Sequence, residues 1–277
     1  MKNLVRRIIK SLRKKELIAI QYPVDSNKIL DGKVALITGA AGGIGSAIVK
    51  ELCSSGCKVI ISGTNKSKLE NLRQNLSVDG LVGGVFCATI NYEDIDSFEK
   101  ALDQIEETTG SIDILVCSAG VHTENVNFWT MTPAEYDRVM DINLKGTFFM
   151  CQAVAKRMIF HKNRGKILLI SSSRGSEPAW SPYGLSKWGM NGLTQGLAKI
   201  LAPYGINVNS IAPGSTATSL IGVKEGDSIC CEDNSFGRLC TPEEVGALAR
   251  YLVNDSSTMI NGETIHMSAG RGVWDIR

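Results

Sequence analysis

The sequence is poor in proline and aromatic residues, and its net charge is close to zero. Only 7 of its 277 residues are proline, 6% are aromatic, and the formal net charge is +2. Hydrophobic residues make up 43% of the chain, which is typical of a globular protein rather than a disordered one. No run approaches the ~18–20 apolar residues that span a bilayer, and the start lacks the apolar segment and cleavage site of a secretory signal.

The sequence also lacks the spacings of a metal site. Its eight cysteines form no CxxC pair, and its three histidines, His122, His161 and His266, are scattered along the chain. Several cysteines lie inside apolar runs such as "GVFCAT" and "ILVCSAG", where a free thiol packs as a small hydrophobic group. We therefore expect no metal site, free cysteines and a reducing, cytoplasmic location.

The positive charge is confined to the N-terminus. Residues 1–33 carry a balance of +6, whereas the remaining residues carry −4, so no nucleic-acid-binding surface is expected on the body of the protein. Residues 1–20 have the period of a basic amphipathic helix. Such a helix could contact a membrane, or it could dock on its own domain or a neighbouring subunit. We assign residues 1–30 to this extension and a linker, and 31–277 to one catalytic domain.

From residue 33 onward, apolar segments alternate with helical patterns. The segments at 33–39, 57–63, 83–89, 113–120, 165–173 and 206–214 are apolar nearly throughout, and helix-like stretches separate them. A last helix and strand follow at 242–266. Continuous apolar strands linked by helices predict an α/β fold with a doubly wound parallel sheet covered on both faces.

The first strand runs into a glycine-rich turn, "VALITGAAGGIGSAIV". Gly39, Gly43 and Gly45 lie where the strand ends and a helix begins. Glycines let the backbone approach a pyrophosphate, and the helix N-terminus offers free N–H groups and partial positive charge. This context predicts a dinucleotide site.

The stretch "SPYGLSKWG" at 181–189 predicts a helix that begins at Pro182, with Ser181 as its cap. Tyr183 and Lys187 are four residues apart and share one face of that helix. We expect the lysine cation to lower the pKa of the phenol, which would make the tyrosine an effective general acid/base. A tyrosine at an interface beside a solvated lysine is the alternative.

These motifs resemble the short-chain dehydrogenase/reductase family over about residues 31–270. The pattern T-G-x-x-x-G-x-G from Thr38 to Gly45 and the pair Tyr-x-x-x-Lys at 183–187 carry the resemblance. It implies a Rossmann-type sheet, a nicotinamide cofactor and hydride transfer between a ketone and a secondary alcohol. It also implies catalytic roles for Asn143, Ser172, Tyr183 and Lys187, although Ser171 or Ser173 could replace Ser172 because the following loop is short.

The same resemblance assigns the cofactor contacts. They fall on the ends of successive strands and on the catalytic helix: Thr38, Gly39, Ala41, Gly43, Ile44, Gly45, Gly63, Thr64, Asn65, Thr89, Ile90, Ser118, Ala119, Gly120, Tyr183, Lys187, Pro213, Gly214, Thr216 and Thr218. The chain departs from the family pattern in three places. Cys117 and Ser118 stand where many relatives have two asparagines, Thr89 stands where an aspartate is common, and Ser268 and Ala269 alter the end of the last strand.

The end of the second strand favours NADP over NAD. Gly63 occupies the position where an acidic residue would bind the ribose 2′-hydroxyl and repel a 2′-phosphate. Thr64 and Asn65 can donate hydrogen bonds to that phosphate, and Lys66 or Lys68 could supply charge. NAD remains the alternative, because the arginine of many NADP users is absent here.

The motifs fix the chemistry better than the substrate. The segment at about 215–237 resembles the family's substrate lid and is polar, which favours a sugar-like or other small polar carbonyl compound; a 3-oxoacyl thioester is also open. The resemblance further implies a homo-oligomer, a tetramer. The alternative function is a weakly catalytic cofactor-binding scaffold, recruited through its N-terminal helix.

Overall fold

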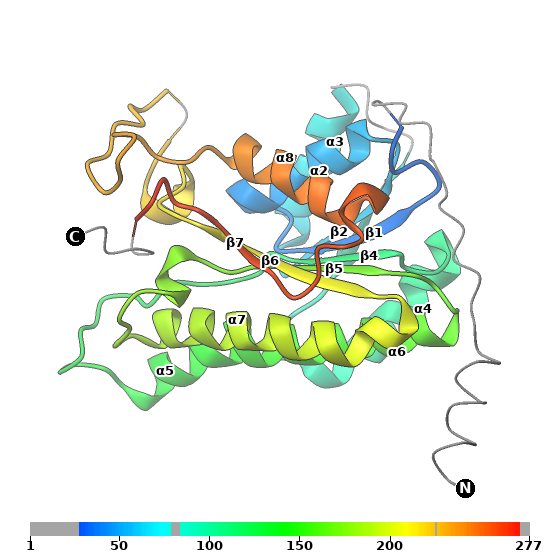
Figure 1. Ribbon diagram of the computed structural model, residues 1–277, viewed down its shortest axis with the longest axis horizontal. Helices are drawn as coiled ribbons and strands as arrows, with labels where there is room; N and C mark the ends of the chain where they lie inside the picture. The colour runs from blue at the N-terminus through cyan, green and yellow to red at the C-terminus, as the bar shows by residue number, and fades with distance from the viewer. Residues whose placement is uncertain (1–27, 79–83, 225, 272–277) are drawn as a thin grey trace, which may run out of the picture.

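The computed structural model describes residues 28–78, 84–224 and 226–271 (Figure 1). The amphipathic helix predicted over 1–20 lies outside these residues. The described chain begins shortly before the first strand, and there the amide of Leu30 donates to the carbonyl of Ser55, which follows α2 (Gly43–Ser54).

Seven parallel strands form one sheet in the order β3-β2-β1-β4-β5-β6-β7. Their bounds are Val34–Thr38 (β1), Lys58–Gly63 (β2), Val85–Thr89 (β3), Ile114–Cys117 (β4), Lys166–Ile170 (β5), Asn207–Pro213 (β6) and Thr264–Met267 (β7). The order reverses direction between β1 and β4. In a doubly wound sheet, ligands bind outside the carboxyl ends of the strands at such a reversal. The predicted α/β fold is confirmed.

Helices cover both faces of the sheet (Figure 1). Figure 1 shows α2 (Gly43–Ser54), α3 (Lys66–Val78) and α8 (Pro242–Val253) on one face. The other face carries α4 (Phe98–Thr109), α5 (Pro133–Met140), α6 (Thr147–Phe160) and α7 (Pro182–Leu201).

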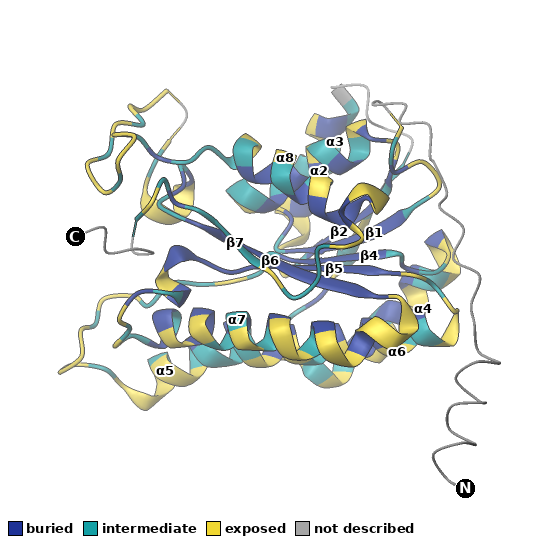
Figure 2. Cartoon of the chain, in the orientation of Figure 1, coloured by how far each residue is buried: buried dark blue, intermediate teal, exposed yellow. Residues whose placement is uncertain are grey.

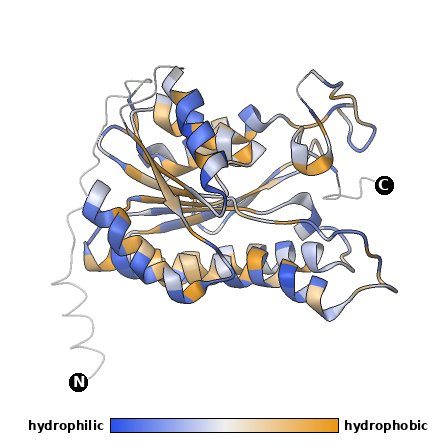
Figure 3. Ribbon diagram, turned by 180° about the vertical axis from the view of Figure 1, so that it is seen from behind, coloured by the Kyte–Doolittle hydropathy of each residue, from blue (hydrophilic) through white to orange (hydrophobic). Residues whose placement is uncertain are grey.

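The core therefore consists of two apolar layers. Successive residues of β1 point to opposite faces, so Val34 and Leu36 pack in one layer, whereas Ala35 and Ile37 pack in the other. The strands are buried along most of their length (Figure 2), and the helices turn their hydrophilic residues outward (Figure 3). This two-sided burial explains why the strands read as continuous apolar runs.

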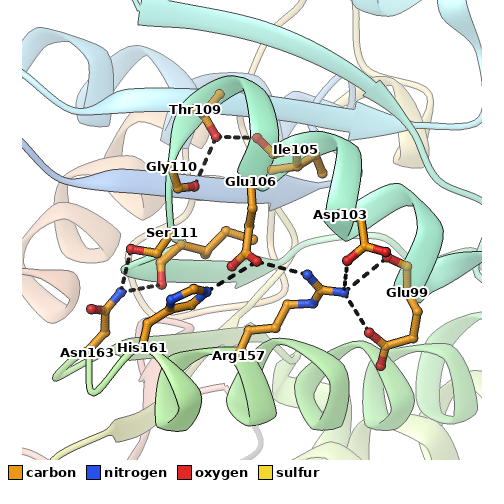
Figure 4. A network of polar contacts seen from close by, with 11 residues as sticks. Glu99, Asp103, Ile105, Glu106, Thr109, Gly110, Ser111, Arg157, His161 and Asn163 are labelled. Carbon is orange, nitrogen blue, oxygen red and sulfur yellow. Dashed lines mark hydrogen bonds and ion pairs between the residues drawn. The ribbon is translucent and has the colours of Figure 1, made fainter.

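Helices α4 and α6 are joined by an ion network centred on Arg157 (Figure 4). Its guanidinium contacts Glu106 at 2.9 Å, Glu99 at 2.7 Å and Asp103 at 2.8 Å. The Arg157 side chain is only 15% exposed, as is that of Glu106. Three carboxylates thus depend on one shielded cation.

We expect Arg157→Gln to lower the free energy of unfolding by about 2 kcal/mol, because it leaves the shielded Glu106 carboxylate without its cation. Urea unfolding followed by circular dichroism measures the change. The matched control is Lys145→Gln, which breaks the surface pair with Asp141. This control should cost less than about 0.5 kcal/mol, and equal losses in the two variants would contradict the prediction.

Candidate active site

The glycine-rich turn lies at the carboxyl end of β1, against the end of β4. Gly39 has φ +63°, and a Cβ there would lie 2.6 Å from Cα of Ala119. A Cβ at Gly45 would overlap the carbonyl oxygen of Gly39. Only glycine fits either position. The first turn of α2 contains no acidic residue, so its free N–H groups remain suited to an anion.

A cleft of about 460 Å³ opens over this turn. Fourteen of the twenty predicted cofactor residues line it: Gly39, Ala41, Gly43, Ile44, Gly45, Gly63, Thr64, Asn65, Ser118, Ala119, Gly120, Tyr183, Lys187 and Thr218. Lys68 and Leu220 also line it. Most of the residues that the sequence placed at one site thus line one cavity, whose size and glycine-lined floor suit a dinucleotide.

The other six predicted residues lie elsewhere. Pro213, Gly214 and Thr216 line an adjoining pocket. Thr89 lines a separate cavity beside α4, and the side chain of Ile90 is buried in the core. The Thr38 hydroxyl is also buried, 2.8 Å from the hydroxyl of Tyr92.

Helix α7 begins as predicted. The Ser181 hydroxyl accepts a hydrogen bond from the amide of Gly184 at 3.2 Å, and Pro182 is the first helical residue. Tyr183, in the first turn of α7, lies at the wall of the cleft. The Nζ of Lys187 lies 5.6 Å from the centre of the Tyr183 ring and donates to the carbonyl of Ile170 at 2.8 Å.

Burial governs both of these titratable groups. It lowers the pKa of Lys187 to about 8. It also raises the pKa of Tyr183, although the neighbouring Ser172 hydroxyl and the charge of Arg174 act in the opposite direction. The expected lowering of the Tyr183 pKa by Lys187 is therefore not seen in the protein alone. Burial destabilises the phenolate by more than the neighbouring groups stabilise it.

The structure separates the three candidate serines after β5. The Ser171 hydroxyl donates to the side chain of Asn191 at 2.7 Å, which ties it to α7. Ser172 and Tyr183 line the same pocket, and the Ser172 hydroxyl is close enough to the phenol to oppose the rise of its pKa. Ser173 also lines that pocket and is 3% exposed. The contact with the phenol favours Ser172 as the functional serine.

Asn143 lies in a π-helical turn, Asp141–Gly146 (η3), between α5 and α6. The sequence predicted one helical stretch over 133–162. In the structure, the wider π-helical turn interrupts the α-helical hydrogen bonding within this stretch, between α5 and α6. The Asn143 side chain accepts from the amide of Val121 at 2.8 Å and donates to its carbonyl at 2.9 Å. Its Oδ1 would lie 3.3 Å from a Cβ at Gly120. Asn143 thus fixes the backbone that follows β4, beside the cleft.

Two functional candidates had no signal in the sequence. The ring of His122 stacks on that of Tyr183, with the ring centroids 3.9 Å apart and an angle of 17° between the ring planes. The hydroxyl of Tyr92 bridges Thr38 and Cys117, at 2.8 and 3.5 Å. Tyr92 therefore joins the ends of the two strands that form the cleft floor. Neither contact follows from local spacing, because each joins distant segments.

Within the described ranges, no group of three or more His, Cys, Asp or Glu side chains could hold a metal ion. Among the helices of the same ranges, none is long and apolar enough to cross a membrane.

Comparison with known proteins decides the family. The family model for short chain dehydrogenases matches residues 33–227, well over half of the chain. The chain belongs to the short-chain dehydrogenase/reductase family. It is 36% identical to the 3-oxoacyl-[acyl-carrier-protein] reductase of Rickettsia prowazekii, over 87% of this chain and 97% of that protein.

Solved short-chain dehydrogenase/reductase structures share the fold. A putative gluconate dehydrogenase from Agrobacterium tumefaciens has a TM-score of 0.79 and 29% identity, covering 87% of this chain and 96% of its own. A variant of the actinorhodin polyketide ketoreductase, solved with NADPH, has a TM-score of 0.78 and 26% identity, covering 87% and 98%. The chain is thus an NAD(P)-dependent oxidoreductase that acts on carbonyl or alcohol groups. The scaffold alternative is not favoured.

For this short-chain dehydrogenase/reductase, we expect Tyr92→Phe to weaken cofactor binding. The variant lacks the Tyr92 hydroxyl, so Thr38 and Cys117 lose the side-chain bridge between the ends of β1 and β4, under the glycine turn. The shorter of these two contacts, the buried hydrogen bond with Thr38 at 2.8 Å, is worth about 1 kcal/mol, which corresponds to about a fivefold rise in Kd. Fluorescence titration with NADPH and NADH measures it. The exposed Tyr136 supplies the control, Tyr136→Phe. An unchanged Kd in Tyr92→Phe would contradict the expectation.

Proposed function

We propose that the enzyme interconverts a ketone and a secondary alcohol, with Tyr183 as the general acid/base. The observation that carries this assignment is the position of Tyr183, which lines both the dinucleotide cleft and the adjoining pocket that contains Ser172. A nicotinamide held in the cleft would supply or accept the hydride. Tyr183 then lies where a substrate in the adjoining pocket would need its proton.

In the reductive direction, Tyr183 donates its proton to the carbonyl oxygen as charge develops there. The Ser172 hydroxyl donates a hydrogen bond to the same oxygen and stabilises that charge. The raised pKa of Tyr183 keeps the phenol protonated at neutral pH, which suits its role as an acid.

Lys187 and Asn143 support the proton transfer by Tyr183. The Lys187 ammonium contributes positive charge near the phenolate that remains after proton transfer, and it can also hold the nicotinamide ribose. Asn143 can link Lys187 to solvent through a water, because its Oδ1 and the Lys187 Nζ approach the same point beside Gly120: a Cβ there would lie 3.3 Å from the oxygen and 3.8 Å from the nitrogen.

NADP(H) is the proposed cofactor. The end of β2 places Gly63, Thr64, Asn65 and Lys68 on the wall of the cleft, and none of them is acidic. Asn65 accepts from the amide of Lys68 at 2.9 Å, so its amide oxygen is used and its NH₂ group remains for a phosphate. NAD(H) is the second candidate.

For the substrate, the proposal extends only to its chemical class. A small polar carbonyl compound, a sugar or polyol, and a 3-oxoacyl thioester are the candidates, and the names of the relatives include both gluconate and 3-oxoacyl substrates.

We also propose that the enzyme is a cytoplasmic homotetramer and that residues 1–20 contact a membrane surface. Large apolar side chains on the outer helices support subunit contacts: Phe148 of α6 is 42% exposed and Trp188 of α7 is 49% exposed.

Tyr183→Phe should lower kcat for carbonyl reduction by about 10²–10⁴-fold, because it removes the proton donor and leaves the ring in place. Turnover of a panel of ketones is followed by NADPH absorbance, and cofactor Kd is measured in parallel. Tyr204→Phe, at an exposed position after α7, is the control. A Tyr183→Phe enzyme that retains wild-type turnover would refute the assignment, and so would a wild type that binds cofactor but turns over no more than the variant.

Gly63→Asp should reverse the cofactor preference. A Cβ at Gly63 would meet only Cδ2 of Leu69, at 3.8 Å, so the backbone accommodates a side chain. The new carboxylate would repel a 2′-phosphate and bind a 2′-hydroxyl. We expect the ratio of Kd for NADPH to Kd for NADH to rise more than tenfold. The isosteric variant Gly63→Asn separates charge from shape. Tighter binding of NADH than NADPH by the wild type would reverse the proposed choice.

A further inference from the structure

The pocket that adjoins the cofactor cleft is small and contains charged side chains. Its volume is about 220 Å³, below the 300–1,000 Å³ typical of sites for drug-sized ligands. Ser172 and Tyr183 lie on one side of it, and Arg174, Asp233 and Arg271 also line it. A substrate whose carbonyl lies at Tyr183 would therefore place its remaining atoms close to these charges.

Arg271 is occupied by acidic partners. It contacts Asp233 at 2.6 Å and Glu177 at 3.4 Å, and it donates to the Ser215 hydroxyl at 2.9 Å. Glu177 is only 8% exposed and also accepts from Arg174 at 2.8 Å. One buried carboxylate thus lies between the two arginines and fixes both of them at the pocket.

Arg174 differs from Arg271 in having donors to spare. Only its Nη1 is bonded, to Glu177, and its Nε and Nη2 form no hydrogen bond or ion pair with any residue in the described part of the chain. The Arg174 side chain is 52% exposed. Burial raises the pKa of Tyr183 and lowers that of His122, and on both of these stacked rings the nearby charge of Arg174 acts in the lowering direction. The guanidinium is therefore close to the reacting centre.

The charges of Arg174 and Arg271 are balanced by those of two carboxylates, Glu177 and Asp233, so the net charge of this group is zero. An anion would consequently be bound by directed N–H groups rather than by a net positive field. A guanidinium with several free N–H groups matches a carboxylate in geometry, and such bonds are stronger than those between neutral groups.

We infer that the substrate is a small carbonyl compound, or the corresponding alcohol, that carries a carboxylate, and that Arg174 binds this carboxylate. This inference rests on the proposed function, because it takes Tyr183 and Ser172 as the carbonyl site. Arg174 follows Ser172 by two residues, so the group that binds the anion and the group that binds the reacting oxygen come from the same turn. The short acid would lie between them.

The test compares each acid with its own neutral form. Reduction of 2-oxobutanoate, 3-oxobutanoate and 4-oxopentanoate is measured beside that of their methyl esters, with NADPH and with NADH. For at least one acid, we expect kcat/KM to exceed that of its ester at least tenfold. Arg174→Gln should lower this acid-to-ester ratio about 10–100-fold, mainly through KM for the acid. Arg174→Lys should give an intermediate ratio, because it keeps the charge and loses the fork geometry.

The ratio separates anion binding from a general effect of Arg174 on Tyr183, which would change the turnover of acid and ester alike. Lys199→Gln removes an exposed cation elsewhere on α7 and should leave the ratio unchanged. The inference would be overturned if the enzyme reduced the esters and other neutral ketones as well as it reduced the acids, and if Arg174→Gln left the acid-to-ester ratio unchanged. The proposed function would stand in that case. No turnover of any carbonyl compound by cofactor-bound wild type would overturn the proposed function together with the inference.

Discussion

The buried ammonium of Lys187 is the constraint on which the site depends. Burying a cation is costly, and this one is 5% exposed, with a hydrogen bond to the backbone carbonyl of Ile170. That bond joins the second turn of α7 to the last residue of β5. Because Tyr183 lies one turn before Lys187, the same bond fixes the phenol at the carboxyl edge of the sheet. The depressed pKa of Lys187 is the consequence of this burial, and a lysine free in solvent would not hold α7 in that register.

A second set of buried contacts connects the cofactor turn to the catalytic helices. Tyr92 reaches Thr38 and Cys117 with its hydroxyl, and its ring packs against the π-helical turn that carries Asn143, where a Cβ at Gly146 would lie 2.6 Å from Tyr92. The cysteine at position 117 therefore does not leave a gap in the polar framework. The tyrosine hydroxyl, from a different element of the chain, adds a side-chain bridge between strand ends that their backbones already join.

The sequence predicted the parts of this site that repeat locally. Apolar runs predicted the strands, and the spacing of Tyr183 and Lys187 predicted a shared helix face. The glycine turn was predictable because its physical requirements, a positive φ at Gly39 and close approach at Gly45, admit one residue type. Contacts between distant segments were not predictable. His122 stacks on Tyr183 across 61 positions of the chain, and no periodicity encodes such a pair. The direction of the Tyr183 pKa shift was also not predictable from the sequence, because it depends on the burial of the phenol in the folded protein.

The pocket beside Tyr183 is built differently from the cofactor cleft. Strand ends and glycine backbone form the cleft, so few substitutions are compatible with it. The charged wall of the pocket comes from three segments far apart in sequence, which meet through Glu177, Asp233 and Arg271. None of these side chains belongs to β1, α2 or α7, the elements that hold the glycine turn and the Tyr183–Lys187 pair. Substitutions in this wall can therefore change which molecule is held while the geometry of proton transfer persists, and this physical separation allows one catalytic framework to serve many substrates.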